Sequence, residues 1–205
     1  MGCYTDHVLP RLMTSAGGRP RVRPLRRRVC EGLSGTVIEI GFGSGHNLPY
    51  YAEAVTSVTT VEPSDVAWTL ARQRIQTSGI PVLRSGLDGA SLPVPDDSYD
   101  VALSTWTLCT IPDVSGALGE LRRVLKPGGS LHFLEHGLAP DETVRRWQRR
   151  LEPIQKRIAG GCHLTRPIVD LLEAAGFVTK DLDVFYADGE PKSVGACSLG
   201  RAISS

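Results

Sequence analysis

Near the start of the chain, glycine occupies three alternate positions: Gly41, Gly43 and Gly45. Because glycine has no Cβ atom, its backbone can approach a bound ligand closely and can adopt positive φ angles. The preceding residues 36–40 are β-branched or apolar except for Glu39, and this pattern predicts a short buried strand. A helix that starts after Ser44 would direct its free N–H groups at the same ligand. The segment therefore predicts a cofactor-binding loop between a strand and a helix.

Two widespread phosphate-binding loops do not fit this segment. The dinucleotide-binding fingerprint needs a small residue at the position that His46 occupies, and it usually follows an apolar strand end rather than an acid such as Glu39. A Walker loop ends in Gly-Lys-Ser or Gly-Lys-Thr, and neither triplet follows these glycines. The loop therefore belongs to a different class of cofactor site.

Acidic residues follow the next two predicted strands. Residues 58–61 are apolar or β-branched, and Glu62 comes directly after them, 21 residues beyond Gly41. A carboxylate at the tip of a second strand can accept hydrogen bonds from both hydroxyl groups of a ribose. Asp88 follows a third predicted strand, so it is either a residue of a surface turn or a group that recognises an adenine. Its position favours the second interpretation.

The pattern E-x-G-x-G-x-G from Glu39 to Gly45, the acid Glu62, and the Asp88-Gly89 step before Leu92-Pro93 together resemble the class I S-adenosylmethionine-dependent methyltransferases. This resemblance implies S-adenosyl-L-methionine as the cofactor. It also implies an α/β fold: a seven-stranded, mostly parallel, doubly wound sheet with capping helices at the N-terminus. The predicted cofactor site comprises Glu39, Gly41, Phe42, Gly43, Gly45, Asn47, Glu62, Pro63, Asp88, Gly89, Ser104, Thr105 and Trp106.

Three further segments resemble a narrower group: Thr107-Leu108-Cys109, Glu135-His136, and residues 161–166 with the pattern G-C-x-L-T-R. They are similar to bacterial relatives of the microsomal methyltransferase-like proteins, for which thiol S-methyl transfer is the associated activity. The similarity covers roughly residues 36–177, whereas the first 35 residues and the end of the chain match poorly. Phe42 replaces the small residue or cysteine common at its position, which should not disturb a backbone contact. The resemblance implies an enzyme that methylates a small-molecule acceptor, with a thiol as one candidate.

These motifs leave the acceptor open. The alternatives are C- or O-methylation of a quinone or phenolic metabolite, N-methylation of a lipid head group and, outside enzymes, a cofactor-binding sensor module. His136 is a candidate base or a core histidine, and Arg166 is a candidate to bind an acidic acceptor. Trp106 is either a core residue or a wall of the pocket. Because Cys162 and His163 are adjacent, their side chains point in different directions, so we expect no nucleophilic pair and a structural Cys162.

Length and composition indicate one globular domain, with residues 1–35 as a helical cap and residues 36–205 as the catalytic core. The net charge of +1 gives no general attraction for nucleic acid. No stretch reaches the roughly 18 apolar residues of a membrane span, so we expect a cytoplasmic protein. Contact with a membrane surface and the oligomeric state stay open.

Two residue types are distributed unevenly. Arginines cluster before the glycine loop and suggest a solvated helix face or, alternatively, a lid or a contact with an acidic surface: Arg19, Arg21, Arg23, Arg26, Arg27 and Arg28. The five cysteines are widely spaced and include no C-x-x-C pair, which predicts reduced thiols, no disulfide and no metal site: Cys3, Cys30, Cys109, Cys162 and Cys197.

Apolar periodicity places regular elements around these residues. Strands are predicted at 36–40, 58–61, 80–83, 99–104 and 131–134. Helices are predicted at 1–18, 25–33, 64–77 with Ser64 as N-cap, 114–125, and within 140–176 on both sides of Gly160-Gly161. Two apolar runs from Val178 onward predict an antiparallel hairpin around a turn at 188–191. Strands that alternate with helices indicate a parallel sheet covered on both faces, with its ligand at the carboxyl ends of the strands.

Overall fold

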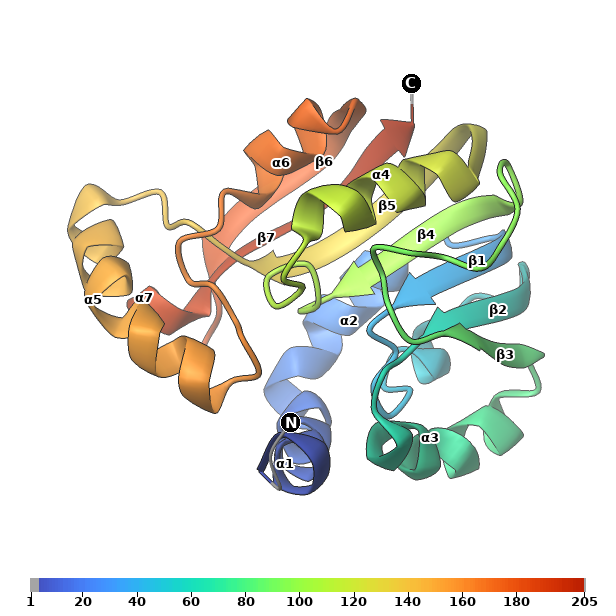
Figure 1. Cartoon of the computed structure of the whole chain (residues 1–205), viewed down its shortest axis with the longest axis horizontal. Helices are drawn as coiled ribbons and strands as arrows, with labels where there is room; N and C mark the ends of the chain where they lie inside the picture. The colour runs from blue at the N-terminus through green and yellow to red at the C-terminus, as the bar shows by residue number, and fades with distance from the viewer. Residues whose placement is uncertain (1–3, 205) are drawn as a thin grey trace.

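The computed structural model describes residues 4–204, so residues 1–3 of the predicted cap, including Cys3, and residue 205 lie outside the described part. Seven strands form one sheet in the order β3-β2-β1-β4-β5-β7-β6 (Figure 1). All pairs are parallel except those of β7, which runs antiparallel to both of its neighbours. The strands are β1 Gly35–Ile40, β2 Val55–Val61, β3 Val82–Gly86, β4 Tyr99–Thr105, β5 Leu125–His136, β6 Phe177–Tyr186 and β7 Ala196–Ser204. The predicted sheet and its closing hairpin are confirmed.

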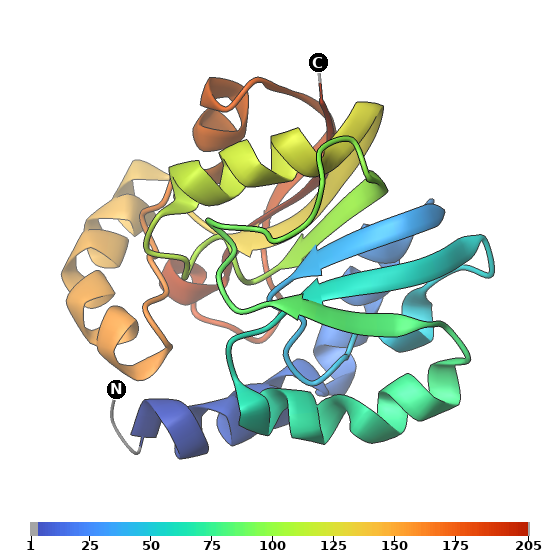
Figure 2. The same cartoon turned by 45° about the vertical axis from the view of Figure 1, so that its right-hand side comes forward.

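Helices cover both faces of this sheet. Figure 1 and Figure 2 show α2 and α3 on one side and α4 and α6 on the other. The helices are α1 Leu9–Gly17, α2 Arg23–Cys30, α3 Asp65–Ser78, α4 Val114–Val124, α5 Glu142–Ile158, α6 Ile168–Ala174 and α7 Lys192–Gly195. A π-helical turn at Tyr4–Val8 and 3₁₀ turns at Pro20–Val22 and Leu48–Tyr50 complete the helical elements. Among residues 4–204, none of these helices combines the length and apolar character that crossing a bilayer requires.

Residues that alternate along β1 contribute to the hydrophobic cores on the two faces of the sheet. Ile38 and Ile40 are buried in the cluster that includes α4 and α6, and Val37 is buried in the cluster that includes α2. Side chains of a strand point to opposite faces in turn, so a strand that is apolar on both faces must lie in the middle of a covered sheet. The position of β1 between β2 and β4 agrees with this expectation.

Local capping fixes where two of the helices begin. The Ser64 hydroxyl accepts a hydrogen bond from the Ala67 amide at 3.1 Å, which confirms the predicted N-cap of α3. Asp113 caps α4 in the same way, because its carboxylate accepts from the Gly116 amide at 2.9 Å. Because α3 follows the end of β2 and α4 follows the end of β4, the N-terminal ends of both helices lie toward the carboxyl edge of the sheet.

Three predicted boundaries were wrong. The chain after Ser44 forms turns and a 3₁₀ helix instead of an α-helix, because Gly45 has a φ of 74° and Pro49 has no N–H for a helical hydrogen bond. The third strand begins at Val82 rather than at residue 80 and continues to Gly86. The segment from Lys126 lies within β5 instead of separating it from α4, since Leu125 pairs with Tyr99 and Ser130 pairs with Val101 of β4 on the two sides of a register shift.

Candidate functional site

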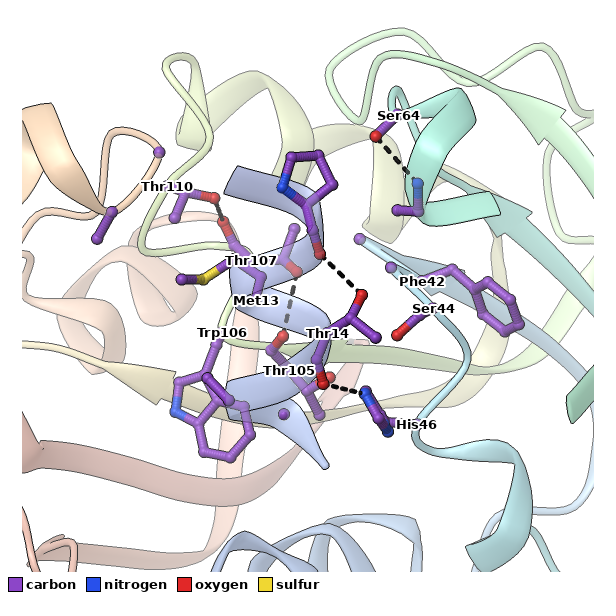
Figure 3. A pocket seen from close by; sticks show the side chains of 18 of the residues that line it. Met13, Thr14, Phe42, Ser44, His46, Ser64, Thr105, Trp106, Thr107 and Thr110 are labelled. Atoms are coloured by element: carbon purple, nitrogen blue, oxygen red, sulfur yellow. Dashed lines mark hydrogen bonds between the residues drawn. The ribbon is translucent and has the colours of Figure 1, made fainter. Parts of the chain in front are cut away.

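A cavity of about 630 Å³ opens at the carboxyl ends of the parallel strands. This volume is within the range of ~300–1,000 Å³ that small-molecule sites have. Helix α1 lies across the cavity, where Thr14 points toward the glycine loop and Met13 points to the opposite side (Figure 3). Ten of the residues predicted from sequence line it: Gly41, Phe42, Gly43, Glu62, Pro63, Asp88, Gly89, Thr105, Trp106 and His136. The motifs from five separate strand ends therefore converge on one pocket.

The first two glycines of the loop have different roles. At Gly41, where φ is 70°, an added Cβ would lie 1.9 Å from the Thr107 hydroxyl oxygen, so this glycine allows two loops to pack together. At Gly43, where φ is 57°, an added Cβ would meet no protein atom closer than 4.0 Å. Because Gly43 lines the pocket, the open space beside it is space for a ligand.

Glu62 is buried and fastened to this loop. One carboxylate oxygen accepts from the Gly43 amide at 2.6 Å and the other accepts from the Ser64 amide at 2.7 Å. Burial raises the pKa of Glu62, and these two amide bonds act against that increase. A carboxylate has about four lone-pair positions, so two remain for hydroxyl groups of a ligand.

Asp88 lines the pocket from the loop after β3 and remains exposed. Its carboxylate accepts from the Ala90 amide at 2.9 Å, so it also stabilises a local turn. The two interpretations of Asp88 are therefore compatible, since one oxygen of the carboxylate is sufficient for the turn.

Five predicted site residues lie outside the pocket lining: Glu39, Gly45, Asn47, Ser104 and Arg166. Glu39 is enclosed behind the loop, where it accepts hydrogen bonds from the Asn47 amide group at 2.6 Å and from the Tyr51 hydroxyl. Asn47 also donates to the Thr105 hydroxyl at 2.9 Å. Burial raises the pKa of Glu39 to about 7. These two side chains shape the loop from behind, because the face of β1 that carries Glu39 is covered by protein.

Ser104 and Arg166 contact other parts of the protein. The Ser104 hydroxyl donates to the Glu135 carboxylate at 2.6 Å. The Arg166 guanidinium is buried and donates to the carbonyl oxygens of Leu108 and Ile111, the latter at 2.8 Å. Arg166 therefore holds the loop after β4, and the structure does not place it where it would bind an acidic acceptor.

The predicted cap does border this pocket, but the part that Arg26 plays in it was not predicted from the sequence. Arg26 is buried, unlike the other five arginines of the cluster, which are exposed as the solvated-face interpretation predicts. Its guanidinium donates to the Asn47 side-chain oxygen at 2.7 Å and to the Gly17 carbonyl at 3.2 Å, and it lies 4.9 Å from the centre of the Trp106 ring. The signal was available, because Arg26 is three residues from the buried Val29 on the same helix face.

His46 connects the glycine loop to the cap. Its Nε2 atom lies 2.8 Å from the Thr14 carbonyl at the end of α1 (Figure 3). Burial, with smaller contributions from Arg74 and Arg26, lowers the pKa of His46 to about 4 even though the Thr14 carbonyl acts in the opposite direction. The folded protein therefore favours a neutral His46 at neutral pH.

We expect acid to weaken this contact. Because the pKa of His46 is lower in the folded state than the ordinary value of 6.5, its contribution to stability is complete above pH 6.5 and is lost as the pH falls toward 4. His46→Gln keeps an N–H donor but removes the titration. Between pH 7 and pH 4.5 the melting temperature of the wild type should therefore fall by more than that of the variant. Equal slopes in thermal melts would contradict the assignment.

Comparison with known proteins agrees with this geometry. Residues 38–133 match the family described as "Methyltransferase domain". The chain is 33% identical over 174 residues to the thiol S-methyltransferase TMT1B of Rattus norvegicus, which covers 82% of this chain and 70% of that protein. The TMT1B of Homo sapiens is 36% identical over 180 residues, covering 84% of this chain and 72% of that protein.

A solved structure supports the fold independently. It is a methyltransferase from Thermotoga maritima, described as a SAM-dependent enzyme and a possible histamine N-methyltransferase. It has a TM-score of 0.70 at 23% identity and covers 98% of this chain and 100% of its own. The chain belongs to the class I S-adenosylmethionine-dependent methyltransferases and is related to the thiol S-methyltransferases.

Proposed function

We propose that this enzyme transfers the methyl group of S-adenosylmethionine to a small thiol. In this proposal the Glu62 carboxylate binds the ribose hydroxyls, Asp88 contacts the adenine, and the backbone at Gly41 and Gly43 accommodates the remainder of the cofactor. The support is the convergence of these groups on one cavity and the free lone pairs of Glu62. Glu39 and Asn47, which lie outside the pocket lining, hold the loop in shape from behind, and Arg26 supports Asn47 from the wall of the pocket.

The main support for a thiol acceptor is that few side chains in the pocket are available to act as a general base. The carboxylates that line it are Glu62, Asp88, Asp188 and Glu190. The first two are assigned to the cofactor, Asp188 is exposed, and Glu190 is paired with Arg21. A hydroxyl or carbon acceptor would need a base in the pocket. Since His46 is bonded to the cap, His136 is the candidate that remains among the histidines and carboxylates of the lining. The rest of the wall is largely apolar and includes Leu9, Met13, Leu25, Ile111 and Ala159.

A thiol needs little assistance in such a pocket. With a reference pKa near 8.5, roughly 3% of a free thiol is already thiolate at pH 7. A sulfonium supplies an activated methyl group, so alignment of the acceptor with that group can provide much of the rate acceleration. Helix α1 and the π-helical turn before it cover the cavity, and a cap of this kind excludes water during the transfer. Within α5, the Ile158 carbonyl accepts from the Tyr4 hydroxyl at 2.7 Å, which ties the cap to the opposite wall.

We expect small thiols to be methylated and His136→Gln to lose less than about tenfold in kcat/KM. This is well below the 10²–10⁴ that is typical when a general base is removed. Formation of S-adenosylhomocysteine with a panel of thiols, phenols, quinones and amines measures both points. Across a series of thiols, the pH at which the rate rises should follow the pKa of the acceptor. His163→Gln is the matched control, since His163 faces Glu152 at 3.4 Å and lies outside the pocket lining.

The same experiment separates the alternatives. Activity that appears only with phenols or quinones and disappears in His136→Gln would replace this proposal with O- or C-methylation assisted by a histidine base. Activity confined to amine head groups would indicate lipid N-methylation. Tight binding of S-adenosylhomocysteine without turnover of any acceptor class would favour a sensor module.

A further inference from the structure

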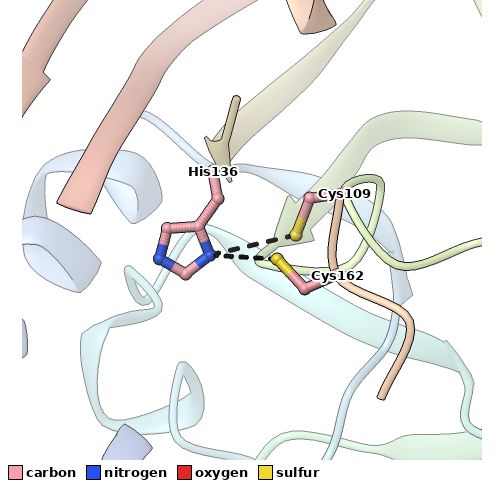
Figure 4. A group of neighbouring side chains, drawn as sticks. All are labelled: Cys109, His136 and Cys162. Carbon is pink, nitrogen blue, oxygen red and sulfur yellow. Dashed lines mark hydrogen bonds between the residues drawn. The ribbon is translucent and has the colours of Figure 1, made fainter. Parts of the chain in front are cut away.

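Two cysteines and one histidine from three separate segments meet beside the pocket (Figure 4). Cys109 lies in the loop after β4, His136 ends β5, and Cys162 lies in the loop between α5 and α6. The His136 Nδ1 atom is 4.0 Å from the Cys109 sulfur and 3.8 Å from the Cys162 sulfur. The three potential ligand atoms all lie within 4.8 Å of one another. Both cysteines are buried, whereas His136 lines the pocket.

We propose that Cys109, His136 and Cys162 form a binding site for Zn²⁺. Tetrahedral zinc has Zn–S bonds of about 2.3 Å and Zn–N bonds of about 2.0–2.1 Å, which places a sulfur and a nitrogen ligand roughly 3.6 Å apart. The sulfur–nitrogen distances of 3.8 and 4.0 Å exceed this value only slightly. The two sulfur–nitrogen pairs therefore need to shorten by only about 0.2 and 0.4 Å to match tetrahedral zinc.

The chemistry of the donors selects the ion. Thiolate and imidazole ligands favour zinc and other thiophilic metals, whereas Mg²⁺ and Ca²⁺ require oxygen ligands. Three protein ligands are also the number found in open zinc sites, where a water molecule or another ligand takes the fourth position. Because Cys109 is fully buried and Cys162 is 3% exposed, an ion bound between them would be shielded from bulk solvent on that side.

Hydrogen bonds hold the first ligand segment in place before any ion binds. The Glu135 carboxylate accepts from the backbone amides of Thr107 and Cys109, each at 3.1 Å. The His163 amide donates to the Cys109 carbonyl at 2.9 Å, which joins the loop after β4 to the loop that carries Cys162. Contacts of this kind orient metal ligands and contribute to affinity.

Arg166 strengthens the same connection. Its guanidinium extends from the loop of Cys162 to the carbonyl oxygens of Leu108 and Ile111, on both sides of Cys109. A charged donor to two carbonyls in a buried position is a strong tie. Glu135 and Arg166, which do not line the cofactor pocket, thus act as positioning residues for the cluster.

Zinc titration of the purified, metal-free full-length protein against a chromogenic chelator tests the site. We expect one Zn²⁺ per chain, and Co²⁺ in its place should give thiolate-to-metal charge-transfer absorption. Because changes outside the ligand set already cost 10–100-fold in metal affinity, Cys109→Ser and Cys162→Ser should each weaken binding by at least about 100-fold. Cys30→Ser is the control, since Cys30 is a buried free thiol outside the cluster, and it should bind zinc like the wild type.

Two results would overturn the site. One is a wild-type zinc affinity equal to that of the Cys109→Ser/Cys162→Ser double variant. The other is a reduced protein that binds no zinc while mild oxidation joins Cys109 to Cys162. If the serine variants fail to fold, as judged by circular dichroism, the zinc affinity of His136→Gln replaces theirs in the test. The His136 side chain is at the pocket surface, so its replacement disturbs the core less. None of these measurements involves a methyl acceptor, so their failure leaves the thiol proposal untouched.

Discussion

Replacing Glu62 by alanine is expected to weaken binding of S-adenosylhomocysteine by about 30- to 900-fold, which corresponds to roughly 2–4 kcal/mol. In the proposed site the variant removes a carboxylate that would accept from two ribose hydroxyls in a buried position, where hydrogen bonds to a charged group are strong and water cannot replace the lost group. Calorimetric titration measures the effect. An unchanged dissociation constant would remove Glu62 from the site, and binding of NADH would contradict the cofactor assignment as a whole.

The structure adds a second consequence of this substitution. The carboxylate also holds the Gly43 amide at 2.6 Å, so its removal frees part of the glycine loop. We therefore expect the melting temperature to fall as well. Asp65→Ala is the matched control, because Asp65 is nearby in sequence and ion-paired with Arg84, yet its side chain is 91% exposed and outside the pocket lining. The Asp65→Ala variant should bind S-adenosylhomocysteine as tightly as the wild type does.

Gly43→Val should fold and lose the cofactor. The φ of 57° is unfavourable for a β-branched residue, which costs stability. The added side chain meets no protein atom closer than 4.0 Å at its Cβ, so it does not clash within the protein and projects into the ligand space. We expect no measurable binding of S-adenosylhomocysteine at concentrations that saturate the wild type, while circular dichroism shows a native spectrum.

Gly79→Val separates backbone strain from occlusion of the pocket. Gly79 ends α3 with a φ of 69°, and an added Cβ there has no neighbour within 4 Å. It carries a comparable conformational cost on the exposed surface and should retain full affinity. Normal binding by Gly43→Val would show that the loop does not contact the cofactor, and loss of binding by both variants would point to a general loss of stability.

Features that depend on neighbouring residues could be predicted from the sequence. The run of β-branched residues before Gly41, the N-cap at Ser64 and the carboxylate at the end of β2 each follow from short-range preferences. Because parallel strands end at the same edge of the sheet, these features also predicted that Glu62 and Gly43 lie together, and the structure places them 2.6 Å apart.

Element boundaries depended on contacts across the fold. Gly45 and Pro49 both disfavour a helix after Ser44, but the left-handed conformation that Gly45 adopts is seen only in the structure, where the loop turns across the strand ends. Its Cβ position is within 3.3 Å of the Phe42 and Leu48 side chains, so the turn is also closely packed. Likewise, β5 extends back to Leu125 because this segment pairs with Tyr99 of β4. No local sequence pattern indicates the packing around Gly45 or the pairing of Leu125 with Tyr99.

Residue type and motif predicted the family, which the comparisons confirm, and brought a candidate cofactor loop and two candidate acidic residues to one pocket, but they did not predict the direction of each side chain. Glu39 belongs to the motif and yet faces a buried network with Asn47. The cluster around His136 was invisible to spacing rules, because Cys109 and Cys162 lie 27 and 26 residues from it on opposite sides. No short motif contains all three residues. Only the order of the strands, which places the end of β5 between two loops, brings the ligands together.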